Sequence, residues 1–76
     1  MFTYTMKKLR RELDEIYQEI EHIQGLITHV KNFQNENPRL MSAKIATLRL
    51  NGLSAQLTFL QGEKKRLEDQ IIIFLN

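Results

Sequence analysis

Residues 6–30 have the sequence MKKLRRELDEIYQEIEHIQGLITHV, and this stretch decides the fold of the chain. Its apolar residues alternate between steps of four and three positions without interruption. The whole series is Phe2, Met6, Leu9, Leu13, Ile16, Ile20, Ile23, Ile27 and Val30. Such an alternation keeps apolar side chains on one face of an α-helix and is typical of a coiled coil. We therefore expect a helix over about 5–34 that packs along its length against a second helix.

A run of turn-forming residues, Asn35-Glu36-Asn37-Pro38, follows this stretch. Pro38 disfavours the α conformation at Asn37 and suits the first turn of a new helix, for which Asn37 would be the N-cap. This pattern predicts a turn over about 35–38 and a second helix over about 38–74. Two long helices with a short connection form an antiparallel hairpin. We therefore expect 1–76 to be one all-α domain, a long helical hairpin that resembles a coiled coil.

The second helix carries an apolar series that matches the first. This series is Ala43, Ala46, Leu50, Leu53, Leu57, Leu60, Leu67, Ile71 and Phe74. In an antiparallel coiled coil the a positions of one helix share layers with the d positions of the other. If facing residues have numbers that sum to 73, apolar residues of the two series face each other, as in the layers Phe2 with Ile71, Ile16 with Leu57, and Val30 with Ala43. One layer is an exception, because Leu9 faces Lys64.

A further apolar series lies on the second helix with the same period, and its centre is roughly 160° away around the helix axis. It consists of Met41, Ile45, Leu48, Gly52, Ala55, Phe59 and Gly62. The first helix can cover only one of the two faces. A chain of this length is marginal as a monomer, and with no cysteine in the sequence a disulfide is excluded. We therefore expect a homodimer, a four-helix bundle, with a docking groove for another protein as the alternative.

The C-terminal stretch 71–75 has the sequence IIIFL, in which the side chains cannot all face one neighbour. Ile72, Ile73 and Leu75 fall outside the predicted seam, so we expect them to contact a second copy or a partner. The β-branched residues leave both helix and strand open for this stretch.

Basic residues prevail near the predicted turn, where Lys31, Arg39, Lys44 and Arg49 accompany Glu36. These four side chains are candidate contacts for nucleic acid. The net charge of the whole chain is only +2, and the opposite end mixes acids with bases. Surface ion pairs are the simpler interpretation there.

Catalysis, metal binding and membrane insertion find little support in the sequence. Glu19 and His22 have the spacing of di-iron helices, but the second such motif is missing. No nucleophile with a nearby base is recognisable, so we expect no enzyme activity, metal or cofactor. Residues 1–24 lack the apolar segment of a signal peptide, and 71–75 is far shorter than the ~20 residues of a membrane span. We expect a cytoplasmic protein, in the host cytoplasm if a virus encodes it.

These features together predict a small non-enzymatic regulator or inhibitor that docks on a macromolecular partner as a homodimer. A nucleic-acid-binding hairpin and a structural or assembly-chaperone coiled-coil subunit are the alternatives. The frequent use of Ile, Lys and Asn suits a phage or another mobile element of low GC content.

Overall fold

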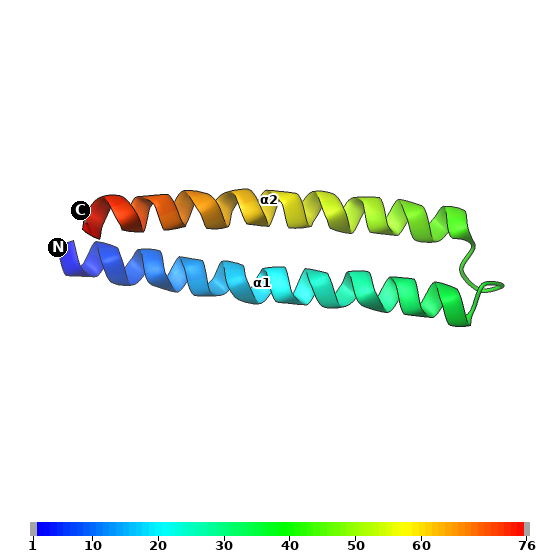
Figure 1. Ribbon diagram of the computed structural model, residues 1–76. Coiled ribbons are helices and arrows are strands. Elements are labelled where there is room, and N and C mark those ends of the chain that lie inside the picture. The colour runs from blue at the N-terminus through cyan, green and yellow to red at the C-terminus, as the bar shows by residue number, and fades with distance from the viewer. Residues whose placement is uncertain (1, 76) are drawn as a thin grey trace.

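The computed structural model describes the backbone of residues 2–75 and the side chains of residues 5–75. It contains the two helices α1, Phe2–Glu36, and α2, Ala43–Leu75. The helices run antiparallel and side by side, and both ends of the chain lie at the same end of the rod (Figure 1). The rod measures 56 × 14 × 14 Å. The predicted all-α hairpin is confirmed.

The apolar core lies along the seam between the helices and consists of residues from the two matching series. Its buried members are Leu9, Ile23 and Val30 on α1, and Ala46, Leu60 and Leu67 on α2. Most other members of the two series are half-buried, because a pair of helices covers each side chain from one direction only. Ala43 is an exception, since it is exposed and not packed in a layer with Val30. The predicted contact of Phe2 with Ile71 lies outside the described side chains.

The connection between the helices spans 37–42 and is longer than the predicted turn. The carbonyl oxygen of Asn37 accepts hydrogen bonds from the backbone N–H groups of Leu40 and Met41, both at 3.0 Å. Asn37 and Pro38 therefore begin one isolated helical turn and not the long helix. The prediction that the second helix starts at about residue 38 is wrong by roughly one turn.

Ser42 takes the N-cap position of α2 that the sequence analysis assigned to Asn37. The Ser42 hydroxyl accepts a hydrogen bond from the N–H of Ile45 at 3.3 Å, and its carbonyl accepts one from Ala46 at 3.0 Å. Serine is a preferred N-cap because its side chain satisfies a backbone donor that has no partner within the helix. The break before Ser42 lets the preceding turn fold back over the end of the hairpin.

Met41 is buried by this turn and does not belong to the outer face of α2, contrary to the sequence prediction. Only 6% of its surface is exposed, and it packs with Val30 and Ala46. Phe33 and Leu50 pack against the same cluster. Burying a methionine side chain contributes about 1.5–3 kcal/mol, which favours the folded turn over a helix that would leave Met41 exposed.

The longer connection also displaces the pairing of the helices relative to the predicted register. The facing helix ends, Glu36 and Ala43, have numbers that sum to 79 and not 73. Lys64 lies over the ring of Tyr17, 5.2 Å from its centroid, where the prediction placed it opposite Leu9. The displacement is close to one heptad, about seven residues. Residues one heptad apart lie on the same face of a helix. The two apolar series therefore still face each other after this displacement.

Candidate functional site

A long exposed apolar surface of the hairpin lies on the outside of α2. We name this surface the outer stripe, and it consists of Ile45, Leu48, Gly52, Ala55 and Phe59. All five residues are exposed, with 64% of Leu48 and 68% of Phe59 open to solvent. They follow one another in steps of three and four, so they form one continuous face of the helix. These residues lie on a face that α1 does not cover, as their spacing in the sequence predicts.

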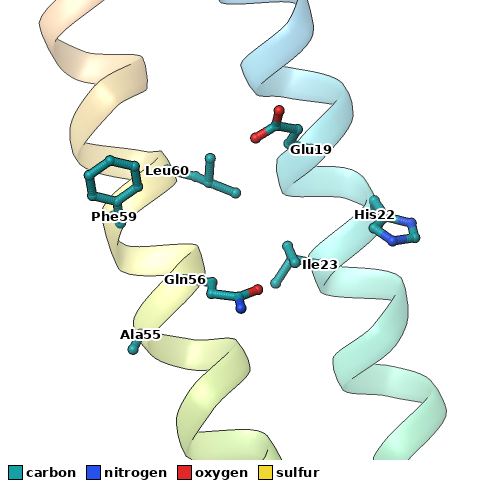
Figure 2. A pocket seen from close by; sticks show the side chains of 7 residues that line it. All are labelled: Glu19, His22, Ile23, Ala55, Gln56, Phe59 and Leu60. Carbon is teal, nitrogen blue, oxygen red and sulfur yellow. The ribbon is translucent and has the colours of Figure 1, made fainter.

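The outer stripe borders a groove between the two helices, which we name the first groove. Its volume is about 590 Å³, and its lining consists of Glu19, His22, Ile23, Ala55, Gln56, Phe59 and Leu60. Figure 2 shows Ile23 and Leu60 pointing into the space between the helices, with Phe59 on the outer side of α2 and His22 on the outer side of α1. The lining of the groove is mostly apolar, and the polar side chains of Glu19 and Gln56 also point toward this space (Figure 2).

A second groove continues along the same side of the hairpin toward the turn. Its volume is about 310 Å³, and its lining includes Leu26, Leu48, Arg49, Gly52, Leu53 and Gln56. Gln56 lines both grooves, so the two hollows are adjacent. The first groove has Glu19 as its acidic residue, whereas the second has Arg49 as its basic residue.

Leu26 is a surface residue that the sequence analysis missed. It is 37% exposed and contributes an apolar side chain from α1 to the second groove. The signal was its position one residue before Ile27, where it flanks the seam. An apolar residue there widens the apolar face of a helix beyond a simple coiled-coil seam.

The opposite side of the seam is polar. Tyr17 and Glu19 flank the seam of α1 on different sides, because Tyr17 follows Ile16 and Glu19 precedes Ile20. On the Tyr17 side, the tyrosine hydroxyl donates a hydrogen bond to Glu68 at 3.4 Å, and the ammonium group of Lys64 lies over the ring. The side that carries the two grooves instead exposes the apolar side chains of Leu26, Leu48 and Phe59.

A smaller exposed apolar cluster lies at the open end of the rod. This C-terminal cluster consists of Ile72, Ile73 and Leu75, which are all exposed, with Ile73 at 73%. The stretch is helical up to Leu75, which answers the choice between helix and strand that the sequence left open. Phe74 is half-buried, so it points toward the seam, while its neighbours point outward.

The four candidate nucleic-acid contacts near the turn are Lys31, Arg39, Lys44 and Arg49, and all are exposed. None of them lies within 4.0 Å of a carboxylate among the described residues. An ion pair is present at the other half of the rod, where Arg66 contacts Glu63 at 3.0 Å. The hydrogen bond that Arg66 donates to the Glu63 carboxylate raises the pKa of Arg66, but a pair this exposed adds little stability.

Within the described part of the chain, no group of three His, Asp, Glu or Cys side chains could hold a metal ion. Glu19 and His22 line the first groove without a third ligand beside them. Neither described helix is long and apolar enough to cross a membrane.

The chain was also compared with known proteins. No protein-family model, curated protein or solved structure shows significant similarity to it. The function is therefore inferred from the shape and chemistry of the surface.

Proposed function

We propose that this chain is a non-enzymatic protein-binding module that acts as a homodimer and regulates or inhibits a macromolecular partner by docking on it. The observation that carries the proposal is the outer stripe, where Leu48 and Phe59 expose most of their surface. A continuous exposed apolar face is unusual on an isolated soluble protein and marks an interaction site. Association with a second helical hairpin removes this face from water and forms a four-helix bundle.

The two apolar surfaces have separate roles in this proposal. The outer stripe runs along the rod and offers a long contact to a second copy. The C-terminal cluster lies at the open end and offers a short contact to a different protein, as a helix end inserted into an apolar groove. Ile73 is the most exposed residue of the C-terminal cluster, so it is the best single position for testing this contact.

The dimer is tested by light scattering on the wild type and the Leu48→Asp variant. We expect the wild type to have the mass of two chains and the variant to be a folded monomer, because a carboxylate cannot be buried without a partner. Circular dichroism confirms that the variant keeps its helices. A wild-type monomer, or a variant that remains a dimer, contradicts the role of the outer stripe.

Partner binding is tested by affinity capture with two matched baits, the wild type and Ile73→Asp. We expect a protein that the wild type retains at both low and high salt and that the Ile73→Asp bait loses while remaining a dimer. Equal recovery by both baits contradicts the role of the C-terminal cluster. A mass that grows with concentration beyond a dimer favours a structural coiled-coil subunit instead.

Nucleic-acid binding is the second candidate, and the four exposed basic residues near the turn favour it. Anisotropy of a labelled oligonucleotide at several salt concentrations distinguishes the two functions. If four phosphates are contacted, the logarithm of the affinity falls with the logarithm of salt with a slope of about −3. Binding that depends on Arg39 and Lys44 with such a slope supports this candidate, whereas no binding at low salt excludes it.

A further inference from the structure

We draw no further inference here: the strongest candidate, the two adjacent grooves between α1 and α2 on the side that exposes Leu26, Leu48 and Phe59, is an unpartnered apolar face, and nothing in the described part of the chain shows what covers it.

Discussion

Ser42 illustrates how a single hydroxyl group positions a whole helix. It satisfies the backbone N–H of Ile45 and separates α2 from the isolated turn that begins at Asn37. This separation allows Met41 to fold inward and close the end of the core. The packing of the connection therefore depends on the hydrogen bond that Ser42 accepts.

Replacing Ser42 with alanine is expected to lower the free energy of unfolding by about 1 kcal/mol, because an N-cap interaction of this size is lost. Urea denaturation followed by circular dichroism measures the change. Ser54→Ala is the control, since Ser54 is exposed within α2 and alanine is a better helix former. If both variants change stability by the same amount, Ser42 does not act as a cap.

At the scale of the elements, α2 carries a buried face and an exposed face along most of its length. Gly52 and Gly25 both have open space around them, but Gly52 lies in the outer stripe and Gly25 lies on the outside of α1. The same substitution to alanine therefore adds a methyl group to two surfaces with different proposed roles.

We expect Gly25→Ala to raise the free energy of unfolding by about 0.5–1 kcal/mol through helix propensity alone. Gly52→Ala is expected to weaken the proposed dimer, because the added methyl group lies in the middle of the outer stripe, the surface proposed to contact the second copy. Sedimentation equilibrium and urea denaturation of both variants give the two quantities. Equal gains in stability with an unchanged dissociation constant would argue against a close contact at Gly52.

The faces of both helices could be predicted from the sequence, but their register could not. Apolar residues at heptad spacing define the face of each helix that points inward, such as the face with Ile20 or the face with Leu53, whichever residue lies opposite. A displacement of one heptad leaves those faces unchanged, so periodicity cannot distinguish the two registers. The connection decides between them, and its length depends on the competition between Ser42 and Asn37 as caps and on the burial of Met41.

The candidate site was predictable to a similar degree. Ile45, Leu48 and Phe59 are exposed as their spacing on the second helix predicts. The grooves beside them could not be predicted, because they depend on which residues of α1 lie opposite. The positions of Leu26 and Glu19 in the grooves can therefore be assigned only when the register is known.

At the scale of the whole molecule, the hairpin is a rod only one pair of helices thick. Few of the side chains in 5–75 are fully enclosed, and among them Leu67 with 2% exposure is the most buried. A chain of about this length buries only about 60% of the surface that its unfolded form exposes, and is marginal alone. The proposed dimerisation would therefore contribute to the stability of the fold.

This contribution predicts that thermal stability depends on protein concentration. For a dimer that unfolds to two chains, Tm is expected to rise by about 5 °C for each tenfold increase in concentration, given an unfolding enthalpy of ~0.7 kcal/mol per residue. Melting curves followed by circular dichroism over a hundredfold range of concentration, roughly 2 to 200 μM, measure the change. A Tm that is independent of concentration would indicate a hairpin stable as a monomer.

Each copy of the hairpin carries one C-terminal cluster at the open end of the rod, so the proposed dimer carries two. Such a dimer is bivalent. It bridges two partner molecules, and its avidity is greatest where their binding sites have a matching separation.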